Sequence, residues 1–238
     1  MRTILSCCVC LLLASHTAAA APAAAQETDG FVPLFDGESI DGWVKRGGKA
    51  TYKVEDGEIV GTSVLNTDNT FLCTPRNYGD FELKVELKVD SKLNSGIQIR
   101  SLCRDEAYNE TAAWPNGKEW SGRIPGGRVH GYQVEIDPSD RSWSGGIYDE
   151  ARRGWLYNLA GDEHKEARAA FKPNEWNEYR IRCEGDHIQT WINGTPVADL
   201  HDDHTAEGFI ALQVHGIGGD KDKEGTQVRW RNLMIKEL

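Results

Sequence analysis

The sequence predicts an all-β sandwich, because short stretches of alternating apolar and polar residues recur between turn signals. The clearest stretch, Phe81–Val89, alternates apolar and charged residues without a break. Two dipeptides that favour tight β-hairpins, Asp56-Gly57 and Asn193-Gly194, each separate two such stretches. Helical periodicity is confined to Asp162–Ala170, which predicts one or two helical turns. Many short strands with so little helix favour two packed sheets over an α/β fold.

The same alternation places further strands, each with one core face and one polar face. The predicted strands are 52–55, 58–61, 81–89, 95–100, 132–137, 179–184, 188–192, 196–198, 209–215 and 228–237. The segment Arg104–Arg128 is long, polar and Gly-rich, which predicts a loop, and its Trp114 and Trp120 suggest a role in binding.

Residues 1–25 have the pattern of a secretory signal peptide, which leaves one folded domain over residues 26–238. Arg2 provides a positive start, an apolar stretch follows, and a run of small residues ends at Ala25. Cleavage after Ala25 is expected, with Ala20 and Ala21 as alternatives. The apolar stretch is shorter than the ~20 residues that a membrane span needs. We therefore expect an exported protein, periplasmic or secreted, without a membrane span.

The chain carries a net charge of −10, and loss of Arg2 with the leader would change this to −11. Nucleic-acid binding is excluded, because it requires basic patches that neutralise phosphates. The three cysteines outside the leader, Cys73, Cys103 and Cys183, permit at most one internal disulfide. Their spacing predicts no zinc site.

A series of motifs resembles the 3-keto-disaccharide hydrolase domain family. They are Pro33-Leu34-Phe35-Asp36-Gly37 with Asp41-Gly42-Trp43, then 54–59, 79–83, 94–100, 131–137, 145–149, 174–177, 210–216 and 229–232, in that order along residues 31–238. The resemblance implies a concanavalin A-like jelly-roll sandwich of two antiparallel sheets with a ligand face. It also implies cleavage of glycosides whose C3 hydroxyl is already oxidised to a ketone. A base would remove the C2 proton, β-elimination would expel the C1 oxygen, and hydration would make the net result a hydrolysis.

One strand of the predicted site places Gln133, Glu135 and Asp137 on a single face, with Val134 and Ile136 toward the core. Two carboxylates about 7 Å apart along a strand can repel each other and raise one pKa. We expect Glu135 and Asp137 to do acid/base work and Gln133 to bind substrate. The alternative is a solvated strand face.

The candidate base for proton abstraction from carbon is His215, which shares its strand face with Gln213, a candidate substrate ligand. His130 is the second choice. His201 and His204 lie in an acidic turn and are interpreted as solvated, and His187 is interpreted as a hairpin residue with no special role. If a cofactor is present it would be a divalent metal ion, held by Glu135, Asp137 and His215.

Arg100 is expected either to polarise the C3 ketone or to form a structural salt bridge with Glu135. Gln98, two residues before it, is expected to bind substrate from the same face.

After Gly145-Gly146, Tyr148 and Asp149 are further candidate substrate ligands. Trp143 and Trp155 are candidate platforms for a sugar ring, while Trp43, Trp176, Trp191 and Trp230 are expected in the core.

Two other functions remain open from the sequence. Glu135-x-Asp137-x-x-Asp140 resembles the catalytic strand of laminarinase-type retaining glycosidases, although Pro138 interrupts it. A non-catalytic carbohydrate-binding module could use the same polar face. In all three cases the partner is a small oligosaccharide or glycoside.

Overall fold

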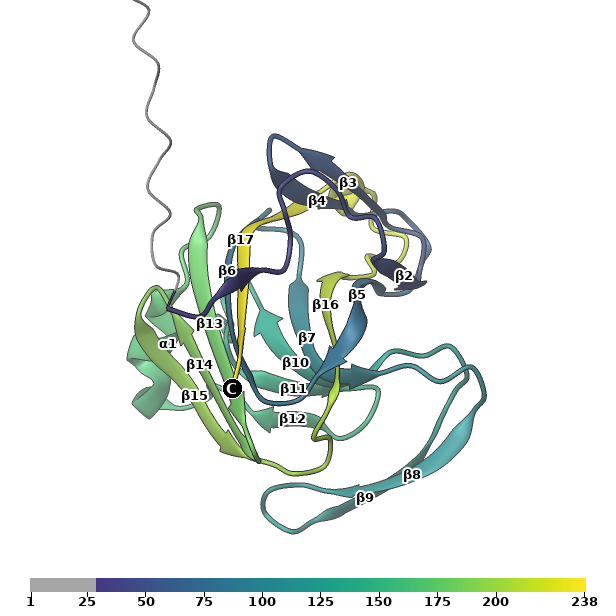
Figure 1. Ribbon diagram of the computed structural model, residues 1–238, viewed down its shortest axis with the longest axis vertical. Coiled ribbons are helices and arrows are strands. Elements are labelled where there is room, and N and C mark those ends of the chain that lie inside the picture. The colour runs from purple at the N-terminus through teal and green to yellow at the C-terminus, as the bar shows by residue number, and fades with distance from the viewer. Residues whose placement is uncertain (1–28) are drawn as a thin grey trace, which may run out of the picture.

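The computed structural model describes residues 29–238, which form two antiparallel β-sheets packed face to face (Figure 1). The predicted signal peptide, residues 1–25, lies outside the described residues. The eight-stranded sheet has the order β15-β14-β13-β6-β17-β4-β3, with β1 also paired to β17, and the seven-stranded sheet has the order β12-β11-β10-β7-β16-β5-β2. The predicted jelly-roll sandwich is therefore confirmed.

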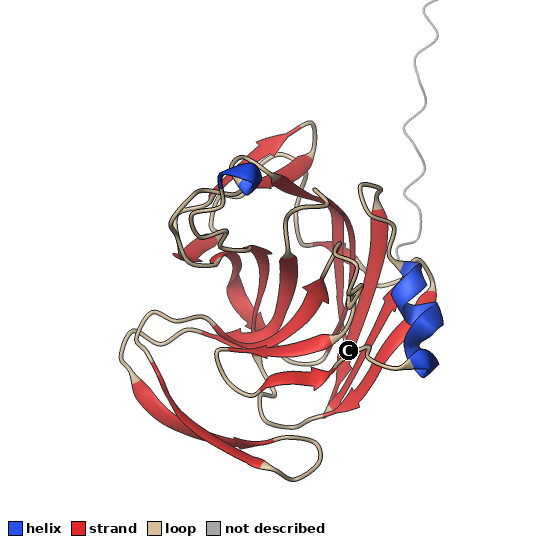
Figure 2. Ribbon diagram, turned by 180° about the vertical axis from the view of Figure 1, so that it is seen from behind, coloured by secondary structure: helices blue, strands red, loops and turns tan. Residues whose placement is uncertain are grey.

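The strands have the following bounds. They are β1 Val32–Pro33, β2 Val44–Gly47, β3 Thr51–Glu55, β4 Glu58–Thr62, β5 Thr70–Tyr78, β6 Phe81–Val89, β7 Ser95–Leu102, β8 Tyr108–Ala113, β9 Glu119–Ile124, β10 His130–Ile136, β11 Ile147–Glu150, β12 Gly154–Tyr157, β13 Asn177–Glu184, β14 His187–Ile192, β15 Thr195–His201, β16 Gly208–Val214 and β17 Gln227–Glu237. The helical turns predicted over Asp162–Ala170 are confirmed as a 3-10 turn, Asp162–His164, and α1, Lys165–Ala170. Figure 2 shows α1 outside the sandwich, and it contacts β15.

The core lies between the sheets, where alternate residues of facing strands meet. In β6 every second residue from Phe81 to Val89 is buried, as the alternation predicted. In the opposite sheet β10 and β16 are buried at every position, and β7 at every position except its last. The polar side chains on the outer face of these three strands are thus covered as well, and they form the floor of the site described below.

The segment predicted as a loop, Arg104–Arg128, instead contains a two-stranded hairpin, β8–β9, beside the sandwich (Figure 1). Its strands are mostly exposed and polar, so they lack the apolar alternation that would have revealed them. Polar contacts hold the hairpin to the body: the Tyr108 hydroxyl lies 2.6 Å from His130 Nε2, and Arg153 donates to the carbonyl of Ala113.

Three further findings concern the cysteines, the helices and the tryptophans of the described residues. Cys73, Cys103 and Cys183 are all free thiols. No helix within residues 29–238 has the length and apolar character to cross a bilayer. Of the tryptophans expected in the core, Trp230 is fully buried, whereas Trp43, Trp176 and Trp191 are partly exposed.

Candidate active site

A polar hollow of about 410 Å³ lies on the outer face of the seven-stranded sheet. It is lined by Asn69, Asn94, Arg128, Gln133, Glu135, Arg141, Tyr148, Glu150, Trp155 and His215. Five of these were predicted site residues: Gln133, Glu135, Tyr148, Trp155 and His215. The consecutive strands β10, β11 and β12 and the residue that follows β16, much later in the chain, thus contribute to one site.

The strand register sets the spacing between the two main titratable groups of the hollow. Glu135 on β10 lies opposite Gly96 on β7, and Gly96 lies opposite Gln213 on β16. His215 follows Gln213 by two residues. The backbones of Glu135 and His215 are therefore two strand spacings apart across the sheet and two residues apart along the strands. Together these offsets separate the two backbones by about 12 Å. This gap accommodates a sugar ring between the two side chains.

Glu135 is 4% exposed and is surrounded by hydrogen-bond donors. Its Oε1 accepts from Asn94 Nδ2 at 2.6 Å and from Arg141 Nη2 at 3.2 Å, and its Oε2 accepts from Gln133 Nε2 at 3.1 Å. Burial outweighs these donors and raises the pKa of Glu135 from 4.5 to about 7. Near neutral pH the group therefore exchanges readily between acid and base forms.

Beneath Glu135, two buried amides fix the position of the Gln133 side chain. Its Oε1 accepts from Gln98 Nε2 at 2.7 Å and from Gln213 Nε2 at 2.8 Å, so its own Nε2 is directed to Glu135. A Cβ at Gly96 would lie 2.5 Å from Gln133 Cδ, so this arrangement requires glycine there. Gln98 and Gln213, predicted as substrate ligands, lie below the hollow and support Gln133 instead.

His215 lies at the end of β16 with its ring exposed in the hollow. Its Nδ1 lies 2.7 Å from the Gly216 carbonyl oxygen, which can only accept, so Nδ1 carries the proton. Surrounding protein removes enough water to lower the pKa of His215 below 6.5. The neutral ring then presents an unprotonated Nε2, which is the form required of a general base.

Asp137 lies beside the hollow but does not line it, which corrects its predicted catalytic role. Its carboxylate accepts from the Ser139 hydroxyl and, at 2.7 Å, from Arg141 Nε. These donors hold the pKa of Asp137 below its usual value despite burial, so it stays ionised. Asp137 positions Arg141, whose guanidinium lies between Glu135 and the rings of Trp143 and Trp155.

The other wall of the hollow comes from β11, where Tyr148 and Glu150 share a face. The Tyr148 ring packs edge-on against Trp155 with a centroid separation of 5.2 Å. Burial, together with the charges of Glu150 and Glu135, raises the pKa of Tyr148, so its hydroxyl remains a donor. Burial also raises the pKa of Glu150, against the opposing effect of Arg128 at 2.5 Å.

The prediction that Arg100 acts in the site is wrong. Arg100 has a positive φ of 44° next to a register shift in the β7–β10 pairing, so the alternation of sides breaks at this residue. Its buried guanidinium donates to the carbonyls of Gly79 and Gly185 and pairs with Asp80 at 2.8 Å. Arg100 therefore joins two turns and forms no pair with Glu135.

Asp149 is also wrong as a substrate ligand, because it follows Tyr148 directly and points to the opposite face of β11. It is fully buried and pairs with Arg152 at 2.7 Å and Arg153 at 2.6 Å. The second-choice base, His130, is buried between Tyr108 and the Arg128 carbonyl and does not line the hollow.

The predicted metal set of Glu135, Asp137 and His215 does not form a cluster. Across residues 29–238 the one group of three metal-ligating side chains with close ligand atoms is His187, Asp199 and His201, on the other sheet.

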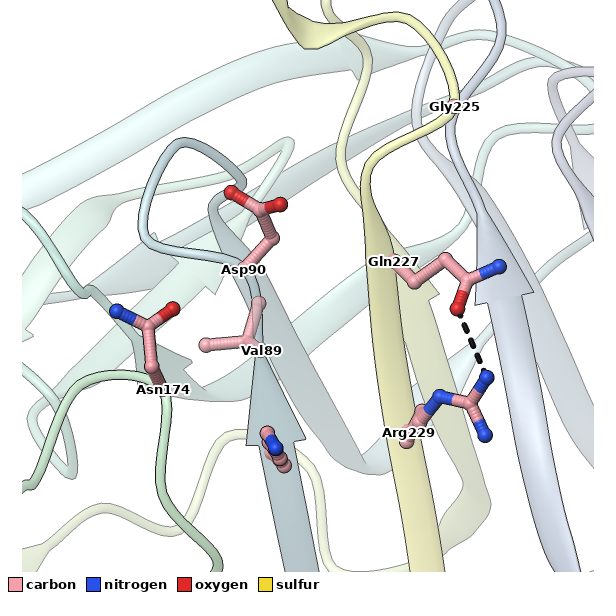
Figure 3. Close-up of a pocket in the computed structure, with 7 residues that line it drawn as sticks. Val89, Asp90, Asn174, Gly225, Gln227 and Arg229 are labelled. Atoms are coloured by element: carbon pink, nitrogen blue, oxygen red, sulfur yellow. Dashed lines mark hydrogen bonds between the residues drawn. The ribbon is translucent and has the colours of Figure 1, made fainter.

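A second hollow, of about 300 Å³, lies between the ends of β6 and β17 and is drawn in Figure 3. Its Arg229 is held by Gln227, Glu55 and Glu58. Its lining contains no histidine and one carboxylate, Asp90, which accepts from the Lys92 amide. This hollow offers no acid/base pair and is not the candidate site.

Sequence reasoning missed Asn69, Asn94, Arg128, Arg141 and Glu150. Glu150 could have been found, because it lies two residues after Tyr148 and so shares its face. Asn94, Arg128 and Arg141 lie in connections between strands, where no periodic signal places a side chain.

The fold and the polar hollow define a jelly-roll sandwich with a candidate site on one sheet. The chain belongs to the family of 3-keto-alpha-glucoside-1,2-lyase-like domains, which it matches over residues 30–236. It is similar in structure to a candidate glycosyl hydrolase of Parabacteroides distasonis ATCC 8503, with 19% identity, a TM-score of 0.55, and coverage of 89% of this chain and 95% of that one. A Bacillus subtilis protein of unknown function with a galectin-like fold gives 11% identity, a TM-score of 0.56, and coverage of 87% and 94%. No curated protein matches this chain.

Proposed function

We propose that this chain cleaves 3-keto-glycosides by β-elimination across C1 and C2, followed by hydration. One observation carries the proposal: a neutral imidazole with a free Nε2 and a carboxyl group with a pKa of about 7 lie on opposite sides of one sugar-sized hollow. Burial shifts the pKa of Glu135 upward and that of His215 downward, so the acid form of Glu135 and the base form of His215 coexist near neutral pH. Membership of the lyase-like family supports the substrate class.

In the first step His215 Nε2 removes the proton from C2 of the bound sugar. The C2–H electron pair forms an enolate with the C3 ketone, which is what makes this proton acidic. The guanidinium of Arg141 lines the hollow and is already oriented by Asp137, so its remaining N–H groups can stabilise the enolate oxygen. Tyr148, with its protonated hydroxyl, is a second donor on this side.

In the second step the enolate collapses to restore the ketone. The C1=C2 double bond forms as the bond from C1 to the glycosidic oxygen breaks, and protonated Glu135 gives its proton to the leaving oxygen. The products are an alcohol and an enone. Trp155, at the edge of the hollow, offers an aromatic surface to the apolar face of the ring.

In the third step water adds to the enone. Ionised Glu135 takes a proton from water as the oxygen bonds to C1, and protonated His215 returns a proton to C2. Both residues regain their starting forms, and the sum of the steps is hydrolysis. The ketone survives unchanged, so no external oxidant or reductant is consumed.

A retaining glycosidase is less well supported by the geometry. Asp140 is exposed, lies beyond the end of β10 and does not line the hollow. The other carboxyl group of the hollow, Glu150, pairs in register with Gly131, about 13 Å along β10 from Glu135. A retaining mechanism needs two carboxyl groups ~5–5.5 Å apart.

The test is turnover of 4-nitrophenyl 3-keto-α-glucoside against the unoxidised parent glycoside, with heat-denatured protein as the blank for spontaneous elimination. We expect release of nitrophenol from the keto substrate alone. Cleavage of the parent at a similar rate would support the glycosidase instead. Saturable binding of either sugar without turnover would support a carbohydrate-binding module and contradict this proposal.

A further inference from the structure

A cluster of two histidines and two aspartates lies on the outer face of the eight-stranded sheet, away from the candidate active site. His187 on β14 pairs in register with His201 on the edge strand β15, and Asp199 lies two residues before His201 on the same face. Asp186 directly precedes β14. All four side chains are partly or largely exposed to solvent.

One of the two imidazoles, that of His201, already has the outer hydrogen bond typical of a metal ligand. The two rings stack with centroids 4.2 Å apart. His201 Nδ1 lies 3.1 Å from Asp186, and His187 Nε2 lies 2.7 Å from Asp199. Asp186, which accepts from His201 Nδ1, fixes the tautomer of that ring and leaves Nε2 with its lone pair, as at many zinc sites. Asp199 faces His187 Nε2 directly, so an ion would bind between these two groups and replace their hydrogen bond. Within residues 29–238 His201 Nε2 has no hydrogen-bond partner.

The charge balance of this cluster also favours a cation. Among the described residues, these two histidines provide the ion-pair partners of Asp186 and Asp199. Both carboxylates belong to an acidic chain of net charge −10. A divalent ion would offset both negative charges.

We propose that His187, His201 and Asp199 bind a divalent first-row transition metal ion such as Zn²⁺, with Asp186 orienting His201 from outside. The ligand atoms of the three residues all lie within 4.8 Å of one another. Tetrahedral zinc with bonds of ~2.0–2.1 Å needs neighbouring ligand atoms roughly 3.3 Å apart. Exposed side chains reach this spacing by small rotations. Imidazole and carboxylate ligands together favour zinc, copper or nickel over magnesium or calcium.

A bound ion would link β15 to β14 by a cross-strand bridge at the free edge of the sheet. Asp199 also lines the groove of about 590 Å³ between α1 and this hairpin, so the ion would lie at the rim of that groove. The proposal does not depend on the catalytic function of the other sheet.

The test is a zinc titration of the untagged, chelator-treated protein in competition with a chromophoric zinc chelator. We expect one tight site, with the association constant reduced at least tenfold in His187→Ala and in His201→Ala. Asp199→Asn keeps the shape of the side chain and removes its charge, so a reduced constant there supports direct ligation without any question of folding.

Two matched controls locate the ion. His164→Ala removes a histidine of the adjacent groove, and His215→Ala removes the imidazole of the candidate active site. Both should bind zinc as the wild type does. The proposal is overturned by the absence of a tight site, by wild-type affinity in both His187→Ala and His201→Ala, or by an equal loss of affinity in either control.

Discussion

Strand β11 supports two buried polar clusters on its opposite faces, and they differ in how fully their hydrogen-bonding groups are used. The core network consists of Tyr132, Asp149, Arg152, Arg153 and Asp202. The hollow cluster consists of Glu135, Arg141, Tyr148, Glu150 and His215, which line the candidate active site. Three consecutive residues of β11, Tyr148, Asp149 and Glu150, alternate between them.

In the core network every charged group has an oppositely charged partner, although Arg152 Nη2 makes no hydrogen bond of good geometry to any described residue. Asp149 accepts from both arginines, and Arg153 also pairs with Asp202 at 2.7 Å. In the hollow cluster some hydrogen-bonding groups have no protein partner within residues 29–238. Among the described residues the Tyr148 hydroxyl has no partner, and Nε2 of His215 is equally free. A carboxylate in the first cluster therefore contributes to stability, whereas one in the second is available for reaction. Residue type and strand position alone do not separate the two roles.

The largest expected effect is on turnover. Glu135→Gln and His215→Ala should each lower kcat on a 3-keto-glycoside by about 10²–10⁴-fold, because each removes a proton-transfer group. Their counterparts outside the hollow, Glu163→Gln at an exposed residue and His164→Ala at a partly exposed one, should retain full activity. Steady-state kinetics on all four variants makes the comparison, and undiminished kcat in His215→Ala would remove that residue from the mechanism.

The next effect is on stability through the core network. Asp149→Asn leaves two buried guanidinium groups without their shared carboxylate, which should lower the free energy of unfolding by about 3–5 kcal/mol. Urea denaturation measures the change, with Asp140→Asn on an exposed turn expected to stay within about 0.5 kcal/mol of the wild type. A loss below about 1 kcal/mol for Asp149→Asn would mean that the network adds little to stability.

Glu135→Gln should instead raise the free energy of unfolding at alkaline pH. Because the folded pKa is raised from 4.5 to about 7, the native state holds a proton that the unfolded chain has lost, and stability falls as pH rises through this window. Gln stays neutral, so at about pH 8 the variant should be more stable by up to about 3 kcal/mol, and near pH 4 the two proteins should agree. Urea denaturation at both pH values checks this, and a destabilised variant at the higher pH would contradict the account.

The smallest effect is on the pH profile. Turnover needs neutral His215, whose pKa is lowered below 6.5, and protonated Glu135, whose pKa is about 7. The profile of kcat/KM should rise through the first and fall through the second, with its maximum between them. In Glu135→Gln the residual rate should lose its alkaline fall, and a fall that persists would assign that limb to another group.

The sequence was a good guide to the fold and to part of the site. Apolar alternation predicted the long strands, and on β10 and β16 it correctly placed Glu135 and His215 on the polar face. It failed where the period of two breaks. At Arg100 the positive φ in the irregular β7–β10 pairing turns the side chain away from the face that Gln98 occupies.

Other misses have different physical reasons. Asp137 lies at the end of β10, where local donors in the following turn capture its carboxylate. The raised pKa of Glu135 was anticipated from repulsion between two carboxylates, but burial is its main cause. Burial depends on packing over the whole sheet, and the spacing of two residues along one strand does not report it.

The central claim is that the hollow cluster breaks the glycosidic bond after removing the proton from C2. Isotope incorporation tests this claim most directly. A 3-keto-glycoside is cleaved in D₂O, the product is trapped at once by borohydride reduction, and deuterium at C2 is measured by NMR. Free 3-keto-glucose carried through the same procedure corrects for spontaneous exchange. Because His215 is exposed in the hollow, its proton exchanges with solvent before hydration, so elimination and hydration predict one solvent deuterium at C2 in each product molecule. Cleavage with the original hydrogen retained at C2 would contradict the account.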